Sequence, residues 1–304
     1  MNKSERKKSE DSLMVKKFRV SDFLLKTAIY ISALIAVLIL AGIICYVFVR
    51  GIGTVNWTFL TTVTSAVRQT VGIAGNLLNT LYIIVITLVI ATPIGVGAAI
   101  YLNEYAGPGK LVSAIEFTTE TLSGIPSIIF GLFGMIFFGN TLKLGYSILT
   151  GAFTLTLMVL PLITRNTQEA LRTVPDSYRS GALGMGATKW YMIRTILLPS
   201  SMSGIVTGII LAIGRIVGES AALLFTAGSG YLLPKFMDSI TENIRILGRK
   251  ALDPGGTLTI ELYLQMHKGK YDTAFGIACV LIVIVLVINL LTKLAVEKLK
   301  PVKS

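Results

Sequence analysis

Two charged residues, Arg215 and Glu219, lie within a long apolar stretch and are the strongest candidates for chemistry. Placing an arginine in hydrocarbon costs about 2.5–3.5 kcal/mol on insertion scales, so such residues usually serve a function. A guanidinium offers a planar fork of donors that suits an oxyanion. Because the two residues are four apart, one helix face would carry both, and Glu219 would orient Arg215 when no anion is bound. The alternative is a structural ion pair between neighbouring helices.

Other reactive side chains do not gather into a site. His267 is the only histidine, so the sequence contains no metal-ligand cluster. Cys45 and Cys279 both lie in apolar blocks, which is not the pattern of a disulfide framework. The Gly-Lys pairs at 109–110 and 269–270 lack the glycine spacing and the following Ser or Thr of a P-loop. We therefore expect no catalytic residues, metal or cofactor in this chain, and no enzyme activity of its own.

A basic segment, residues 165–199, is the second candidate. Pro175 suits a boundary between two helices because it lacks a backbone N–H, and Asp176 suits a helix N-terminus. From Ser177 to Leu198 bulky apolar residues alternate with basic ones, which predicts an amphipathic helical hairpin broken around Gly184 and Gly186. This pattern fits two interpretations equally well, a helix that lies on anionic lipid headgroups and a helix that docks on another protein.

Apolar blocks must position these residues. The chain is 53% hydrophobic and 14% charged, with a mean hydropathy of +0.74, whereas soluble domains carry about 25% charged residues. A membrane-spanning helix needs about 20 mainly apolar residues, because the hydrocarbon core is about 30 Å thick. Six blocks are long enough: Thr27–Val49, Leu77–Leu102, Thr121–Leu142, Leu144–Thr164, Ser200–Ala227 and Thr273–Thr292. The predicted fold class is an all-α membrane protein with six transmembrane helices.

Lysine and arginine predict the orientation, because they collect in cytoplasmic loops. The basic N-terminal tail (1–26), residues 103–120, residues 165–199 and the C-terminal tail hold 18 of them, and the segments on the opposite side hold nine. Both termini are therefore expected in the cytoplasm, with residues 228–272 as an external loop. A lipid bilayer accounts for the net charge of +12, so we expect no nucleic acid partner.

The basic segment also resembles a known motif, the EAA loop of binding-protein-dependent ABC importers. The positions concerned are Ser180, Gly181, Ala182, Gly186, Ile196, Leu198 and Pro199. All of them match except Ser180 and Gly181, which stand where the motif has glutamate and alanine. In that family the loop contains a coupling helix that sits in a groove of a separate ATP-binding subunit. The resemblance implies that ATP and Mg are bound by this partner chain.

Three other runs resemble the A-type permease (PstA) of the high-affinity phosphate importers: Leu77–Tyr105, Glu120–Phe138 and Ala212–Ala227. This resemblance implies the type I ABC importer (MetI-like) permease fold, with a first helix at 27–49 before a five-helix core at 70–296. It implies import of inorganic phosphate across the cytoplasmic (inner) membrane by alternating access, with Arg215 and Glu219 on the substrate pathway. The implied partners are a second permease (PstC type), a dimeric ATPase (PstB type) and an extracytoplasmic phosphate-binding protein (PstS type).

Three alternatives stay open from the sequence. The same mechanism would serve another oxyanion, such as sulfate or molybdate. A secondary anion transporter or a channel would work without any ATPase. A membrane scaffold without transport would not need Arg215 at all.

Overall fold

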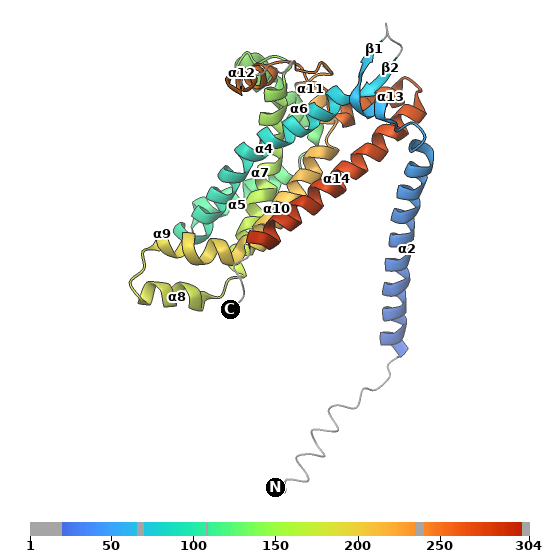
Figure 1. The fold of residues 1–304 in the computed structure, drawn as a ribbon. Coiled ribbons are helices and arrows are strands. Elements are labelled where there is room, and N and C mark those ends of the chain that lie inside the picture. Colours follow the sequence, from blue (N-terminus) through green and yellow to red (C-terminus); the bar gives the residue numbers. More distant parts are fainter. Residues whose placement is uncertain (1–19, 66–69, 108, 235–239, 300–304) are drawn as a thin grey trace. The chain divides into compact units, whose positions relative to one another are not determined.

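Long apolar helices form most of the structure, a computed structural model that describes residues 20–65, 70–107, 109–234 and 240–299 (Figure 1). The chain divides into two units, Met1–Val49 and Arg50–Ser304. The first contains most of helix α2 (Val20–Gly51). Large apolar side chains are exposed along α2 from Phe23 to Val49. A helix that is apolar on all sides is typical of a membrane span.

Five stretches of the described chain are long and apolar enough to cross a membrane. They are Phe23–Gly51 in α2; Ala74–Tyr105, joining α4 (Ala74–Ile100) to the π-helical turn η1 (Tyr101–Tyr105); Ile148–Arg172, which is α7; Lys189–Gly218, joining α9 (Lys189–Met192), η3 (Ile193–Leu197) and α10 (Leu198–Gly218); and Tyr271–Leu294 in α14 (Tyr271–Leu299). A sixth is a bent pair, in which α5 (Lys110–Ser123) meets α6 (Ser127–Gly134) and η2 (Met135–Thr141) at 103°. With this pair counted as one span, the predicted six helices are present.

The third span differs from its predicted bounds, Thr121–Leu142. Helix α5 begins at Lys110, inside a segment expected to be a loop, and the bend comes between Ser123 and Ser127. Pro126 is the residue before α6. Proline has no N–H to donate and its ring blocks the preceding helical turn, so the helix stops and the chain changes direction there.

The fifth span also differs from its predicted bounds, Ser200–Ala227, because it begins earlier, at Lys189, and ends earlier, at Gly218. Helix α10 ends at Gly218, and a separate helix α11 (Ala221–Thr226) follows. Glu219 has an extended backbone with ψ 123°, and its carboxylate accepts a hydrogen bond from the N–H of Ala222 at 3.0 Å. A side-chain oxygen that satisfies an N–H at a helix start stabilises the break.

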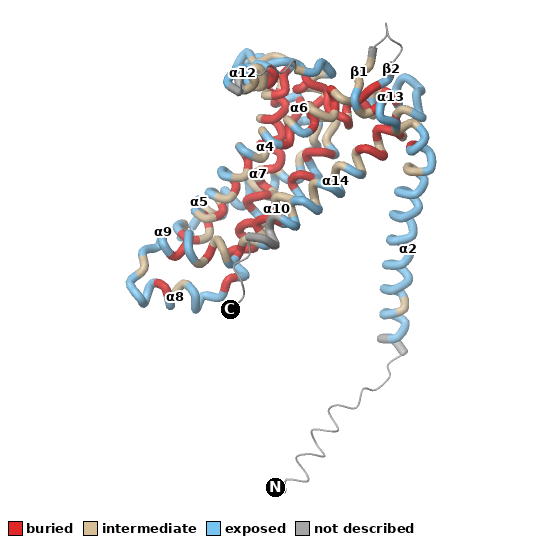
Figure 2. The backbone as a smooth tube through the Cα atoms, viewed as in Figure 1, coloured by how far each residue is buried: buried red, intermediate tan, exposed pale blue. Residues whose placement is uncertain are grey.

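Helix α7 is the centre of the second unit. It packs against α4, α5, α6 and α10, and 67% of its apolar window is buried, against 33% for the stretches that contain α4 and α10 (Figure 2). A Cβ on Gly204 of α10 would stand 2.5 Å from the Cβ of Ala170 on α7, and one on Gly208 would stand 2.7 Å from the Cβ of Asn166. The two helices therefore approach each other closely at this pair of glycines.

Short elements lie at the two ends of this helical unit (Figure 1). One end carries α3 (Trp57–Thr61), the antiparallel strands β1 (Val63–Ser65) and β2 (Thr70–Ile73), α12 (Ile240–Lys250) and α13 (Leu258–His267). The other end carries α8 (Asp176–Gly184) and α9, the helical hairpin predicted from the basic segment. Residues 1–19 of the predicted tail and residues 235–239 of the predicted external loop lie outside the described residues.

Candidate functional site

Arg215 lies in the last turn of α10, on a side of the helix that the rest of the unit leaves exposed. Exposed positions recur along this side at intervals of three or four residues: Ser203, Thr207, Leu211, Gly214 and Gly218. At both exposed glycines a Cβ would have no atom within 4 Å. The neighbours of Arg215 on this side are therefore mostly small or hydroxyl-bearing residues, unlike the large apolar side chains of a lipid-facing helix.

The packing of α10 on α7 gives the depth of Arg215 in the bundle. Gly204 lies against Ala170 and Gly208 against Asn166, so the two helices are antiparallel. Eleven residues beyond Gly204, Arg215 is level with residue 159, close to the middle of α7. Arg215 therefore lies deep in the bundle, as expected, although α10 ends three residues later at Gly218. Carbonyls without helical partners at a helix C-terminus favour a cation.

The expected ion pair between Arg215 and Glu219 is not formed. The expectation assumed one continuous helix, in which residues four apart share a face, but α10 ends at Gly218. The Glu219 carboxylate caps α11 instead, and its backbone carbonyl accepts a hydrogen bond from Thr259 Oγ1 at 2.9 Å. Within the described part of the chain, the Arg215 side chain has neither an ion pair nor a hydrogen bond.

Two spans are interrupted, and the short helices that follow their breaks pack on each other. Helix α6 follows one break and α11 follows the other, and a Cβ on Gly131 of α6 would stand 2.8 Å from the Cα of Ala222 on α11. A cavity of about 220 Å³ lies beside this contact, lined by Ile128, Ser220, Ala221, Leu224, Phe225, Ile260 and Tyr263. Interrupted helices near the membrane midplane are typical of transporter sites, because they bring backbone donors and acceptors to that depth.

A polar groove of about 350 Å³ lies between α7 and α10, on the hairpin side of Arg215. Most of its lining side chains carry hydroxyl, amide or carboxylate groups: Asn166, Glu169, Ala170, Thr173, Ser200, Ser201, Ser203, Gly204 and Thr207. Ser203 and Thr207 also belong to the exposed side of α10 that carries Arg215. Hydroxyl groups both donate and accept hydrogen bonds, so the groove can solvate a polar solute.

The hairpin at the other candidate site turns at Gly186, which has φ +83°. The N–H of Gly186 donates to the carbonyl of Leu183, and the N–H of Ala187 donates to the carbonyl of Ala182, both at 3.0 Å. These two bonds form the Schellman pattern that closes a helix C-terminus, whose left-handed residue is usually glycine. The glycine that matches the EAA motif therefore has a conformational reason to be there.

The other motif residues divide by burial. Ser180 and Gly181 are exposed, Ile196, Leu198 and Pro199 are half-buried, and Ala182 is buried. Ala182 belongs to an apolar cluster whose other buried members are Leu171, Val174, Met192, Ile193 and Leu197. The inner side of the hairpin thus packs against its own base.

The outer side of the hairpin keeps large apolar side chains on the surface. They are Tyr178, Leu183, Met185, Trp190 and Tyr191, and Met185 is 84% exposed. Exposed apolar surface of this kind marks contact with another protein or a membrane. Both interpretations of the amphipathic pattern therefore remain open from the geometry alone.

Arg179 on α8 has a partner that the sequence does not predict. Its guanidinium lies 3.0 Å from Glu104 Oε1, and the two side chains are 18% and 4% exposed. Glu104 belongs to η1 and is 75 positions away in sequence, so no local pattern could pair the two. Hydrogen bonding to Glu104 raises the pKa of Arg179 further above its already high ordinary value. The Arg179 guanidinium therefore stays charged throughout the physiological range of pH.

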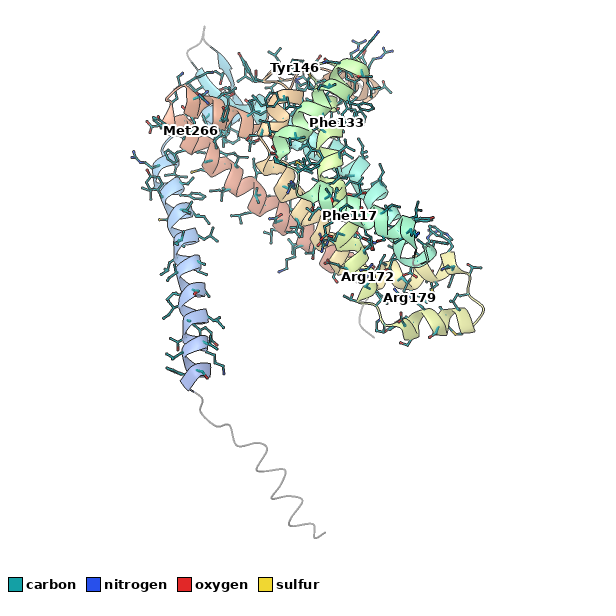
Figure 3. All side chains as sticks on the ribbon, turned by 180° about the vertical axis from the view of Figure 1, so that it is seen from behind. Phe117, Phe133, Tyr146, Arg172, Arg179 and Met266 are labelled. Carbon is teal, nitrogen blue, oxygen red and sulfur yellow. The ribbon has the colours of Figure 1, made fainter. Side chains whose placement is uncertain are left out.

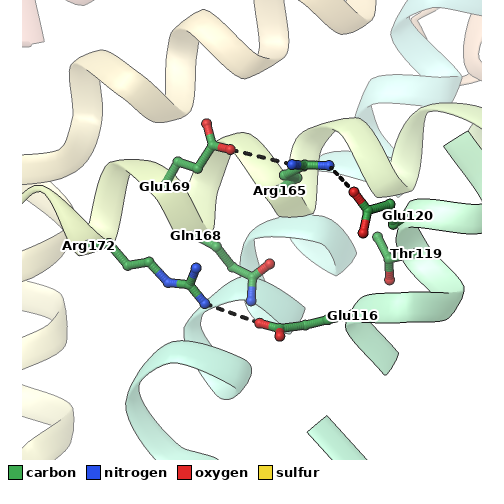
Figure 4. Close-up of a pocket in the computed structure, with 7 residues that line it drawn as sticks. All are labelled: Glu116, Thr119, Glu120, Arg165, Gln168, Glu169 and Arg172. Carbon is green, nitrogen blue, oxygen red and sulfur yellow. Dashed lines mark hydrogen bonds and ion pairs between the residues drawn. The ribbon is translucent and has the colours of Figure 1, made fainter. Parts of the chain in front are cut away.

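A smaller pocket of about 190 Å³ lies between α5 and α7 (Figure 4). Arg165 pairs with Glu120 at 3.3 Å and with Glu169 at 3.4 Å, and Arg172 pairs with Glu116 at 3.1 Å. These side chains are 43–70% exposed, and exposed ion pairs contribute little stability. Carboxylates outnumber guanidiniums in this pocket, so it does not favour an anion.

Residues 91–302 match the family described as binding-protein-dependent transport system inner membrane component. The chain belongs to this family. Members are permease subunits of ABC transporters, so this permease is a membrane transport component, as the EAA-like loop implied.

Relatives in three bacteria agree with the family. The probable ABC transporter permease protein YqgI of Bacillus subtilis is 36% identical over 280 residues, which cover 90% of this permease and 94% of the relative. The phosphate transport system permease protein PstA of Haemophilus influenzae is 34% identical over 72% of this permease and 77% of its own length. PstA 1 of Mycobacterium tuberculosis is 31% identical over 90% and 87%. The resemblance to PstA-type permeases is confirmed.

Solved structures share the fold. A bacterial ABC transporter involved in the import of alginate superposes with a TM-score of 0.63 at 16% identity, over 93% of this permease and 98% of that chain. The MetNI methionine ABC transporter gives 0.53 at 20% identity, over 76% and 95%. These likenesses confirm the predicted type I ABC importer permease fold.

Proposed function

We propose that this permease is one half of an ATP-driven importer that carries inorganic phosphate across the cytoplasmic membrane by alternating access. The observation that carries the proposal is the exposed guanidinium of Arg215 at mid-depth in the bundle, which has no ion-pair partner among the residues that the structure describes. The relatives named as phosphate transport system permease proteins support phosphate as the anion. In this proposal Arg215 keeps its predicted role and meets the anion, whereas the role of Glu219 changes from orienting Arg215 to holding the helix break beside it.

A single guanidinium suits an anion that must be released as well as bound. Its parallel N–H donors match two phosphate oxygens, and water exclusion strengthens the attraction. Transport also requires binding weak enough for the ion to leave, and one arginine meets this need better than a closed cage of donors. The hydroxyl groups of the groove between α7 and α10 then offer hydrogen bonds on the way toward the hairpin end.

The surfaces of the permease fit the partners that this function requires. The exposed side of α10 would face a second permease of the PstC type, which closes the pathway. The outer side of the hairpin would dock on an ATPase of the PstB type, which binds ATP and Mg. ATP binding draws the two hairpins together and opens the pathway outward, toward a phosphate-binding protein of the PstS type at the opposite end. Hydrolysis resets the transporter.

Phosphate uptake by cells that lack this gene, complemented with variants, tests the proposal. Arg215→Gln should lower uptake by about tenfold or more, because a hydrogen bond to a charged group is worth about 1.5–3 kcal/mol. Arg215→Lys should keep part of the uptake, because it keeps the charge and loses the fork. The control is Arg249→Gln on α12, an exposed arginine outside the spans, which should transport normally.

Each rival function has its own result in this assay. Normal uptake by Arg215→Gln would contradict the proposed pathway. Uptake of sulfate or molybdate in place of phosphate would keep the mechanism and change the cargo. Uptake that survives deletion of the partner ATPase would instead indicate a secondary transporter.

A further inference from the structure

Helix α8 is attached to the rest of its unit by very few of its own side chains. Within α8, all of which the structure describes, only Ala182 is buried. A methyl group offers little apolar area, so this contact alone is a weak mechanical link. The other inward-directed attachment is Arg179, which lies with Arg172 at this end of the unit (Figure 3).

Arg179 uses all five of its N–H donors. Nε donates to the two carboxylate oxygens of Glu104 at 3.3 and 3.4 Å, and Nη2 donates to Glu104 Oε1 at 3.0 Å. Nη2 also donates to the carbonyl of Leu171 at 2.9 Å. Nη1 donates to the carbonyl of Val174 at 2.8 Å and to Asp176 Oδ1 at 3.0 Å. One guanidinium therefore joins the end of α7, the connecting turn, the start of α8 and the turn η1 that follows α4.

The π-helical turn η1 contacts both helices of the hairpin. Glu104 binds Arg179 of α8, and the ring of Tyr105 lies 5.1 Å from Lys189 Nζ of α9, a cation–π contact. Asn103 donates to Glu104 Oε1 at 2.7 Å and so fixes the carboxylate. Because the Glu104 side chain is only 4% exposed, water cannot readily replace its partner.

We propose that Arg179 is a positioning residue for transport, which through Glu104 makes α8 and η1, the turn that continues α4, move as one body. The inference rests on the proposed function, in which a partner ATPase displaces the hairpin. A two-point contact between guanidinium and carboxylate resists rotation as well as separation. Helix α4 packs along α7 and α10, and α10 carries Arg215. Movement of α8 therefore reaches the pathway through this contact.

The test is the number of phosphate ions transported per ATP hydrolysed, measured with the complete purified transporter in proteoliposomes. Arg179→Gln should lower this ratio several-fold while ATP hydrolysis continues. The matched control is Arg172→Gln, which removes an arginine–glutamate pair of similar length, 3.1 Å, whose side chains are 61% and 43% exposed. This control should keep the ratio of the unmodified transporter.

Two further variants separate coupling from folding. Arg179→Lys keeps the charge, but an ammonium cannot reach the carboxylate and the backbone carbonyls together, so its ratio should be intermediate. Glu104→Gln keeps the shape and loses the charge, and it should lower the ratio as Arg179→Gln does. The double variant Arg179→Gln/Glu104→Gln should have a transport ratio no lower than that of either single variant. All three changes remove the same connection between Arg179 and Glu104.

An unchanged ratio in the Arg179→Gln transporter overturns the inference. So does failure of both Arg179→Lys and Glu104→Gln to assemble, because the pair would then serve folding alone. The proposed function fails by a different result, the absence of ATP-dependent phosphate uptake by the unmodified transporter.

Discussion

Arg215 and Glu219 differ in how much of their role the sequence reveals. An arginine in an apolar stretch is costly in any packing arrangement, so its importance can be inferred without a structure. The role of Glu219 depends on the backbone at its own position. Its extended ψ of 123° ends α10 and brings the N–H of Ala222 to its carboxylate. The carboxylate therefore caps the start of α11 and does not pair with Arg215.

Gly186 gives a prediction at the same scale. Its φ of +83° is left-handed, a conformation that costs a residue with a Cβ about 1–2 kcal/mol. Gly186→Ala should therefore loosen the hairpin turn and lower transport per ATP hydrolysed, even though a Cβ there would meet no atom within 4 Å. The measurement is the transport ratio of the reconstituted complex.

The matched control for that change is Gly184→Ala, two residues earlier in the same turn. A Cβ on Gly184 also meets nothing within 4 Å, and Gly184 is not among the residues with positive φ. The Gly184→Ala transporter should move as much phosphate per ATP hydrolysed as the unmodified one. Equal ratios for the two variants would show that the left-handed turn has no part in coupling.

Helices were predicted with unequal success, and the reason lies in what hydropathy measures. An apolar window reports composition over about 20 residues, so it found α4, α7 and α14 but joined α10 to α11 across a break. It also missed α5, whose sequence mixes apolar residues with Glu116, Glu120 and several threonines. Proline at position 126 was a signal for the bend in the third span, but its magnitude of 103° comes from packing.

Glycines on α10 test the packing of two elements. Gly204→Ala should destabilise the permease by about 1–3 kcal/mol, because its new Cβ would stand 2.5 Å from the Cβ of Ala170 and overpack the contact with α7. Gly214→Ala, on the open side of the same helix, should be neutral or stabilising by up to about 1 kcal/mol.

Thermal unfolding of the purified permease in detergent measures both variants. The α7–α10 contact is the quantity under test, so no partner subunit is needed. If the Gly204→Ala protein is at least as stable as the Gly214→Ala protein, the close contact between α7 and α10 does not contribute to the stability of the permease.

Orientation in the membrane belongs to the whole molecule, and the charge asymmetry of 18 to nine predicts it. The hairpin should face the cytoplasm and the α12–α13 end should face outward. In a variant whose two native cysteines are replaced by alanine, Met185→Cys should react with a membrane-impermeant maleimide only after permeabilisation. Leu252→Cys should react in intact cells. These positions are 84% and 54% exposed, so access within the protein does not limit either reaction.

The control is the cysteine-free protein, which should remain unlabelled. Labelling of Met185→Cys in intact cells, with protection of Leu252→Cys, would reverse the orientation. It would also remove the hairpin from the side on which an ATPase can act.

The sequence by itself determined the composition-driven properties: a polytopic helical membrane protein, an arginine within the fifth span, and a hairpin with a glycine turn. Each follows from local physics, since lipid selects apolar runs and a left-handed turn selects glycine. Only the tertiary structure decided which distant groups meet. Arg179 finds Glu104 across 75 positions, and Arg215 and Glu219 part because a helix ends between them. Contacts of this kind depend on how elements pack and where the backbone breaks, which composition and spacing do not contain.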